Sequence, residues 1–303
     1  MKINVFICGL LALSLLACGE PNCGEPNDDG KDPGTEQPED KPQEKPEPEP
    51  KPEPEPIPLP EISKEVPACS IAEFTNWQTH LPSDRILYDF SGVCLNKDKS
   101  GLIAVDNSWG GLYNITFDGE RSDAFLKTGK DMEGVTIDPE TGTIYMSEEG
   151  GNFIWKAEEK DGKWGFSRVK WINAGSGDSN SGLEGITYHD GYLYVANQSP
   201  AKLFIYSIEH AGVAHSYEAD FITECFSDLW FDTTNNTLWA VDAWSDDKEI
   251  VNFTIWGDFI ARFKSEVPWV EGICIDFENN KAWFACDSTG QLYSADIVRS
   301  TEE

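Results

Sequence analysis

The sequence has 303 residues, with 54 Asp and Glu against 23 Lys and Arg, and a formal net charge of −31. Residues 61–303 contain 41 of these acids and 18 of these bases, so this part alone carries −23. The excess excludes nucleic acid as a partner, because phosphate binding needs a surface of Lys and Arg. It equally disfavours charge-driven binding to an anionic membrane. The length predicts one domain, or two at most.

The N-terminus is predicted to be a signal peptide. Lys2 precedes an apolar stretch, residues 3–17, which is shorter than the ~20 residues that a spanning helix needs. The stretch ends in Leu15-Leu16-Ala17-Cys18, which resembles the lipobox of bacterial lipoproteins. That resemblance implies removal of residues 1–17 and lipid attachment, including palmitate, at Cys18. The alternative is a plain secretory signal with a chance cysteine.

The lipobox resemblance also implies a location in the bacterial cell envelope, with the membrane as partner through the lipid. Gly19 stands where an Asp would favour retention in the inner membrane, so the outer membrane is expected. The acids that follow Gly19 resemble export signals of lipoproteins displayed on the cell surface.

Residues 18–60 are predicted to form a disordered Pro/Glu-rich spacer between the lipid and the head. Residues 19–60 contain 13 of the 18 prolines and none of the 11 tryptophans. Proline fixes φ and favours extended geometry before it, so alternating Pro and Glu or Lys gives a stiff spacer of ~3.1 Å per residue. The head is then expected over residues 61–303.

The head contains five similar segments. Each begins with an acid or Ser, usually followed by Gly, and continues as a short strand, a turn and a second strand that ends in a carboxylate or amide. Their first residues are Ser91, Glu133, Glu184, Asp228 and Glu271, which are 42, 51, 44 and 43 residues apart. Their second strands end at Asp106, Glu148, Asn197, Asp242 and Asp287.

This period predicts an all-β fold, a β-propeller with five countable blades. A strand from residues 70–90, with Arg85-Ile86-Leu87-Tyr88 as the best candidate, is expected to close the ring. A sixth, degenerate blade built partly from residues 61–88 is one alternative. A β-sandwich is the other, although it would not require the same acidic pair in every repeat.

Three phrases resemble the SdiA-regulated family of bacterial propeller proteins, which is related to the esterase-like phytase group. They are Asp131-Met132-Glu133-Gly134-Val135, Met146-Ser147-Glu148-Glu149 and Leu183-Glu184-Gly185-Ile186. The likeness covers roughly residues 84–298. It implies the fold and an envelope location more than a reaction, and similar motifs occur in NHL and gluconolactonase-like propellers.

The repeats predict a divalent-cation site at one mouth of the propeller channel. First strands line the channel, and a hairpin brings the start of the first strand beside the end of the second. Converging carboxylates must protonate, pair with bases or bind a cation, and Ca²⁺ accepts flexible sets of 6–8 oxygen ligands. The candidate ligands are Glu133, Glu184, Asp228, Glu271, Asp106, Glu148, Asp242 and Asp287. The structural alternative is that these acids cap strand ends or accept backbone N–H groups.

The function expected is non-catalytic binding of a small molecule or partner protein at this mouth, with Trp109, Trp244 and Trp269 as candidate rim contacts. Each tryptophan has packing between blades as its alternative role. The alternative function is a metal-dependent hydrolase of phosphoesters or lactones, with Glu148 or Glu149 as base. Histidine is scarce, and no nucleophile elbow or zinc spacing is present. The head's five cysteines are expected to be buried free thiols, although a Cys94–Cys274 pair is conceivable.

Overall fold

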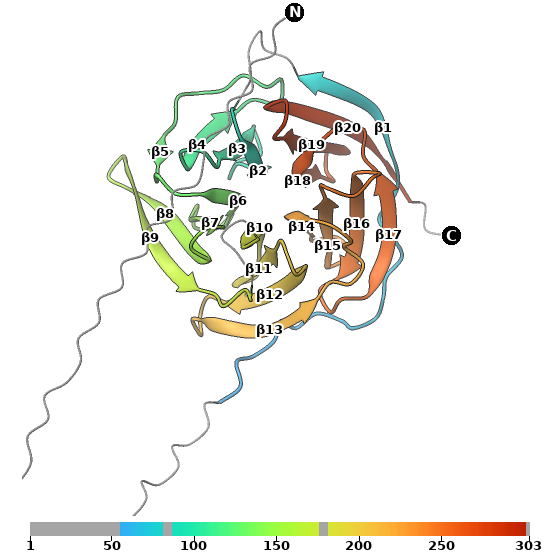
Figure 1. Cartoon of the computed structure of the whole chain (residues 1–303), viewed down its shortest axis with the longest axis horizontal. Helices are drawn as coiled ribbons and strands as arrows, with labels where there is room; N and C mark the ends of the chain where they lie inside the picture. Colours follow the sequence, from blue (N-terminus) through green and yellow to red (C-terminus); the bar gives the residue numbers. More distant parts are fainter. Residues whose placement is uncertain (1–54, 81–86, 176–180, 301–303) are drawn as a thin grey trace, which may run out of the picture. The chain divides into compact units, whose positions relative to one another are not determined.

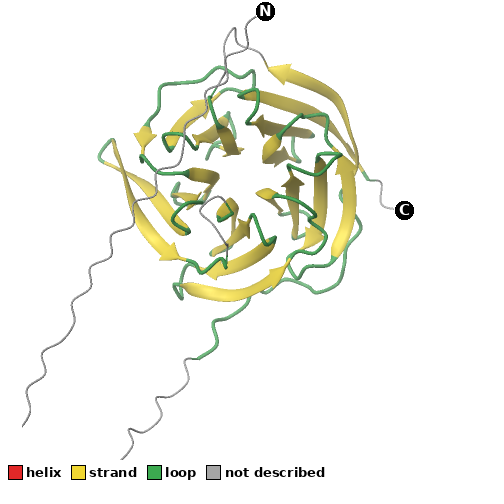
Figure 2. Ribbon diagram, viewed as in Figure 1, coloured by secondary structure: helices red, strands yellow, loops and turns green. Residues whose placement is uncertain are grey.

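A computed structural model describes residues 55–80, 87–175 and 181–300. Within these ranges the secondary structure consists of strands, arranged in five four-stranded antiparallel sheets around one axis (Figures 1 and 2). The predicted five-bladed propeller is confirmed, and the described residues contain no sixth sheet. No helix in the described ranges is long and apolar enough to span a membrane. The predicted signal peptide, Cys18 and most of the predicted spacer lie outside the described residues.

The strands form four concentric layers. The innermost strands are β2 (Phe90–Leu95), β6 (Met132–Ile137), β10 (Leu183–His189), β14 (Phe226–Asp232) and β18 (Val270–Asp276). The second strands are β3 (Leu102–Asp106), β7 (Ile144–Glu148), β11 (Tyr192–Asn197), β15 (Thr237–Asp242) and β19 (Lys281–Cys286). The third strands are β4 (Gly111–Ile115), β8 (Phe153–Lys160), β12 (Lys202–Ser207), β16 (Glu249–Thr254) and β20 (Gln291–Arg299). The outer strands are β5 (Leu126–Lys127), β9 (Lys163–Trp171), β13 (Gly212–Glu218), β17 (Phe259–Lys264) and β1 (Ile71–His80). Blades 1 to 5 are numbered here in the order of their inner strands.

The ring is closed by β1, which pairs antiparallel with β20 and completes blade 5. The prediction that a strand from residues 70–90 closes the ring is confirmed, but the candidate segment 85–88 is wrong: Leu87 is buried outside any strand, and Tyr88 is exposed. The apolar residues within 85–88 favoured the wrong segment, because an outer strand faces solvent on one side and needs few apolar residues. In β1 it is Ile71 and Phe74 that are buried, among polar neighbours.

The core consists of five apolar clusters, one between each pair of adjacent blades. Second strands are buried on both faces because each blade is packed between two others, as in β3, where Ala104 and Val105 belong to different clusters. This explains why these strands read as continuous apolar runs in place of an alternating pattern.

The segment before β1 runs along the turns at one end of blades 3 and 4. Tyr192 Oη donates to the Pro58 carbonyl at 3.2 Å, and Trp256 Nε1 donates to the Ser63 carbonyl at 3.0 Å. The end of the propeller that carries these turns is called the lower end here. The end at which inner strands begin and second strands finish is called the mouth.

Candidate metal centre at the mouth

A β-bulge sits near the start of every inner strand. In β6, Met132 pairs with Glu148 and Val135 with Met146, so Glu133 and Gly134 of one strand face only Ser147 of the other. The same irregularity occurs in the other four inner strands. A bulge bends its strand and redirects a side chain. By this register, the residues equivalent to Glu133 are Ser91, Glu184, Ser227 and Glu271.

The register moves blade 4 by one residue from the arrangement expected from the sequence motif. Phe226 pairs with Asp242 just as Met132 pairs with Glu148, so Ser227 holds the position of Glu133. Asp228 occupies the position that is glycine in the other four blades. The motif predicted the wrong residue of blade 4, because Asp228-Leu229 resembles the acid and following apolar strand of the other repeats.

The glycines at this position stand against the neighbouring blade. A Cβ added to Gly134 would lie 2.7 Å from the carbonyl oxygen of Glu184, and one on Gly92 would lie 2.6 Å from that of Glu133. The close approach of the neighbouring blade therefore leaves no room for a side chain at these two positions. Asp228 alone carries a side chain there, and its Oδ2 accepts the backbone N–H of Ile273 at 2.9 Å. Its buried Oδ1 has no hydrogen-bond partner among the described residues.

We call the residues predicted at the ends of the second strands the outer ring: Asp106, Glu148, Asn197, Asp242 and Asp287. Asp242 and Asp106 of this ring use their carboxylates in structural hydrogen bonds. Asp242 accepts the backbone N–H groups of Thr223, Glu224 and Cys225 at 2.7, 3.3 and 2.9 Å. Asp106 accepts two long backbone bonds, each of 3.4 Å, from Tyr88 and Trp109. These two side chains hold loops at the ends of strands, which is the structural alternative.

The remaining members of the outer ring differ from one another. Glu148 Oε2 accepts the indole N–H of Trp155 at 2.7 Å, and Asn197 Nδ2 donates to the Pro200 carbonyl at 2.8 Å. In blade 5 it is Cys286 that pairs with Val270. Asp287 therefore lies one residue beyond the ring position expected for it.

Three carboxylates of blade 2 converge at the mouth. One oxygen each of Asp131, Glu133 and Glu149 lies within 4.8 Å of the other two. Asp131 comes from the loop before β6, Glu133 from the bulge in β6, and Glu149 from the turn after β7. Asn107 Nδ2 donates to Glu133 Oε1 at 3.0 Å. We call Asp131, Glu133 and Glu149 the acidic triad.

Two further acids lie close enough to the triad to affect its charge. Burial, followed by the charge of Glu271, raises the pKa of Glu133 well above its ordinary value. Burial and then the charge of Glu133 do the same to the pKa of Glu184. The pKa of Glu271 is raised to about 8, by burial first and by Asp287 next. Burial also raises the pKa of Asp131.

Nearby bases do not neutralise these groups. Within the described ranges, no ion pair joins a Lys or Arg to Glu133, Glu184, Asp228 or Glu271. The nearest pair at this mouth is that of Lys130 with Glu148, at 3.9 Å. Buried carboxylates without bases either stay protonated or bind a cation.

The spacing of the triad fits a hard cation. Oxygens bound to one Ca²⁺ at 2.3–2.6 Å lie at most about 5 Å apart. The donor set consists of carboxylates, which suit Ca²⁺ or Mg²⁺ better than thiolate-seeking metals.

The sequence does not identify two members of the acidic triad as metal ligands. Asp131 appears there only within a family motif, although it stands two residues before Glu133, and Glu149 appears only as a candidate base. Alternation along a strand would place residues 131 and 133 on one face, which was the signal available. Ser227 could not be recognised from the sequence as the equivalent of Glu133, because Asp228 replaces the glycine that follows this position in the other blades.

The candidate rim tryptophans are exposed at the mouth. Trp109, Trp244 and Trp269 are 71%, 52% and 42% exposed and lie in turns at this end of blades 1, 4 and 5. Lys248 Nζ lies 4.8 Å from the Trp269 ring centroid. Packing between blades is therefore not their main role, and their surfaces are available to a ligand.

The other predicted features fall elsewhere. His189 stacks on Phe231 at 3.9 Å, toward the lower end, away from the triad. The head's cysteines are free; four are buried and Cys69 is partly so, as expected, and Cys94 and Cys274 form no disulfide. The glycine- and serine-rich segment at residues 175–182 lies mostly outside the described residues.

Part of the chain matches one protein family, and the fold is similar to several solved structures. Residues 95–214 match the family described as "Phytase-like: Esterase-like activity of phytase", a segment that includes the triad and Glu184 but less than half of the chain. No curated protein sequence matches the chain.

Among solved structures, Myxococcus xanthus glutaminyl cyclase superposes with a TM-score of 0.56 at 11% identity, over 78% of this chain and 100% of that one. A nidogen/laminin complex gives a TM-score of 0.49 at 14% identity, over 71% of this chain and 80% of that one. Virginiamycin B lyase from Staphylococcus aureus gives 0.42 at 18% identity, over 76% and 74%. At such identities the similarity to glutaminyl cyclase concerns the fold alone.

Proposed function

We propose that this protein is a cell-envelope lipoprotein whose propeller binds a divalent cation, with Ca²⁺ as first choice, at the acidic triad and thereby a small-molecule or protein ligand. The observation that carries the proposal is the approach of three carboxylates to within 4.8 Å, with Glu133 buried and without a base. The exposed tryptophans at the same mouth supply flat surfaces for the ligand.

The test is metal-dependent stabilisation of the purified protein. Ca²⁺ that binds only the folded state raises the thermal midpoint by mass action. Glu133→Gln should remove this rise, whereas Glu120→Gln, at an exposed position away from the mouth, should retain it. Elemental analysis after dialysis should find about one metal ion per chain in the parent protein and less in Glu133→Gln. No rise with millimolar Ca²⁺ or Mg²⁺ would refute the cation site.

The envelope location rests on the lipobox resemblance and is part of the proposal. Membership of the SdiA-regulated family agrees with it, and the match of residues 95–214 to a phytase-related family supports that membership. Cys18→Ala should abolish partition into the detergent phase, and Cys23→Ala, five residues further on, is the matched control. Equal partition of Cys18→Ala and the parent would contradict lipid anchoring.

A metal-dependent hydrolase of phosphoesters or lactones is the second candidate, and the family match favours it. Asp131, Glu133 and Glu149 would hold the cation, which supplies polarisation of a phosphate or lactone oxygen. Glu148 would accept a proton, because Trp155 orients its carboxylate at 2.7 Å and Lys130 lies 3.9 Å away.

Turnover separates the two candidates. A hydrolase should cleave p-nitrophenyl phosphate or a simple lactone, and should lose this activity in EDTA and with Glu148→Gln. A binding protein should bind Ca²⁺ and show no turnover of either substrate class.

A further inference from the structure

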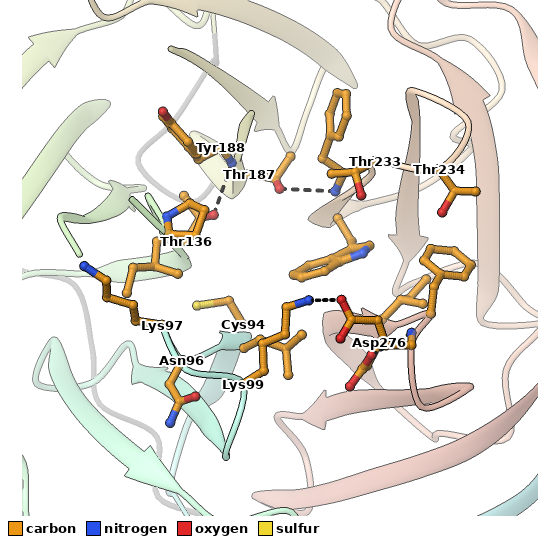
Figure 3. A pocket seen from close by; sticks show the side chains of 18 of the residues that line it. Cys94, Asn96, Lys97, Lys99, Thr136, Thr187, Tyr188, Thr233, Thr234 and Asp276 are labelled. Atoms are coloured by element: carbon orange, nitrogen blue, oxygen red, sulfur yellow. Dashed lines mark hydrogen bonds and ion pairs between the residues drawn. The ribbon is translucent and has the colours of Figure 1, made fainter. Parts of the chain in front are cut away.

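The lower end of the channel contains a cavity of about 470 Å³. It is lined by the ends of all five inner strands and by the turns that follow them, so residues far apart in the sequence surround it (Figure 3). The volume falls within the range typical of small-molecule sites. The acidic triad does not line it.

Trp230 of the inner strand β14 lines this cavity. By register, the equivalent positions in the other inner strands hold small side chains: Cys94, Thr136, Thr187 and Cys274. This asymmetry gives the indole room at the axis, where it packs against three of the five apolar clusters. Its Nε1 is buried and has no hydrogen-bond partner among the described residues.

Two threonines add further donors to the cavity. Thr136 Oγ1 accepts the backbone N–H of Tyr188 at 3.1 Å, and Thr187 Oγ1 accepts that of Phe231 at 3.2 Å. Figure 3 shows both threonines beside the cavity, on neighbouring inner strands. Each hydroxyl uses its oxygen as an acceptor and so keeps its proton to donate. The inner wall therefore carries two hydroxyl groups that keep a proton to donate, whereas the indole N–H of Trp230 is buried.

The opening is positively charged in a strongly acidic head. Lys97, Lys99 and Arg299 line the cavity, against the acids Asp276 and Glu278. Asp276 is occupied, because it accepts the backbone N–H groups of Glu278 and Asn279 and the Asn279 side-chain amide.

Glu278 is engaged more loosely than Asp276. It pairs with Lys99 at 2.5 Å, but the two side chains are 72% and 49% exposed. An exposed ion pair contributes little to stability, so another anion can replace Glu278 at modest cost.

We propose that this cavity binds a small aromatic carboxylate. The bases at the opening and the donors on the wall select an anion that accepts hydrogen bonds. The aromatic surfaces of Trp230, Tyr188 and Phe277 suit a flat apolar body. The site is separate from the proposed cation site and does not depend on it.

The test is calorimetric titration of the full-length protein with 2-naphthoate, with the detergent buffer alone as blank. 2-Naphthamide, which has nearly the same shape without the charge, is the ligand control. One site should bind naphthoate about tenfold more tightly than the amide, the difference expected for one charge-assisted hydrogen bond. EDTA should leave this binding unchanged.

Three variants locate the site. Lys99→Gln should weaken naphthoate binding about tenfold, and Trp230→Phe, which removes the N–H group and reduces the aromatic surface of the wall, about fivefold. Lys156→Gln is the matched control, because Lys156 pairs with Glu158 at 2.8 Å on the surface of blade 2 and should bind like the parent.

Several results would overturn the proposal. The first is no binding at millimolar naphthoate. The second is an affinity for naphthamide equal to that for naphthoate. The third is an equal loss of naphthoate affinity in Lys99→Gln and Lys156→Gln. Loss of binding in Glu133→Gln without any effect of Trp230→Phe would assign the ligand to the mouth and would also overturn it.

Discussion

Asp228 accepts the backbone N–H of Ile273 at 2.9 Å and so joins the inner strand of blade 4 to that of blade 5. Its side chain stands near the axis at a position that is glycine in the other four blades. Burial raises the pKa of Asp228 well above its ordinary value. A protonated carboxyl resembles an amide in shape, and both can accept this bond.

Asp228→Ala should destabilise the protein by about 1–3 kcal/mol, because the buried N–H of Ile273 loses its acceptor. Asp228→Asn keeps an acceptor oxygen and should cost clearly less near neutral pH. Urea unfolding of both variants measures the difference. Equal destabilisation by Ala and Asn would show that the hydrogen bond is not the main contribution of Asp228.

Without a divalent cation, stability should fall as the pH rises from about 4.5 to about 8. The pKa of Glu271 is raised from 4.5 to about 8 in the folded protein, so the folded state binds more protons than the unfolded state between these values. Glu133 and Glu184 shift in the same direction. Thermal midpoints in EDTA across this range check the slope, and Glu271→Gln should flatten it. A slope of opposite sign would contradict the raised pKa.

Ca²⁺ binding at the mouth should release protons at pH 7. A cation binds the ionised carboxylates, whereas burial raises the pKa of Glu133 and so favours its protonated form in the absence of the cation. Affinity should therefore increase with pH, and the calorimetric heat should differ between two buffers of different ionisation enthalpy. Binding that releases no protons would place the cation on surface carboxylates.

Phe74→Ala should open the closure of the ring and cost about 3–5 kcal/mol. Phe74 of β1 lies at ring-centroid distances of 5.4 Å from Phe263 and 6.0 Å from Trp239 and Phe284. Phe259→Ala is the control, because Phe259 is 48% exposed on the outer strand of blade 4 and should cost about 1 kcal/mol or less. Guanidinium unfolding compares them, and equal effects would argue against β1 as the closing strand.

The sequence alone determined the architecture of the head. Each blade repeats the same short strands and turns, so the period and the five-blade count could be predicted. The closing strand could be predicted only to lie within residues 70–90, because β1 is an outer strand whose pairing with β20 depends on contacts across more than 200 residues.

The tertiary structure decided which acids meet. The hydrogen-bond register assigns Ser227, in place of Asp228, to the ring, because a bulge leaves no unambiguous mark in the sequence. It also directs Asp242 onto backbone N–H groups, while Asp131 and Glu149, contributed by a loop and a turn, join Glu133. A sequence pattern shows which residues end strands. The spatial position of each carboxylate depends on bulges and loops that the packing of neighbouring blades fixes.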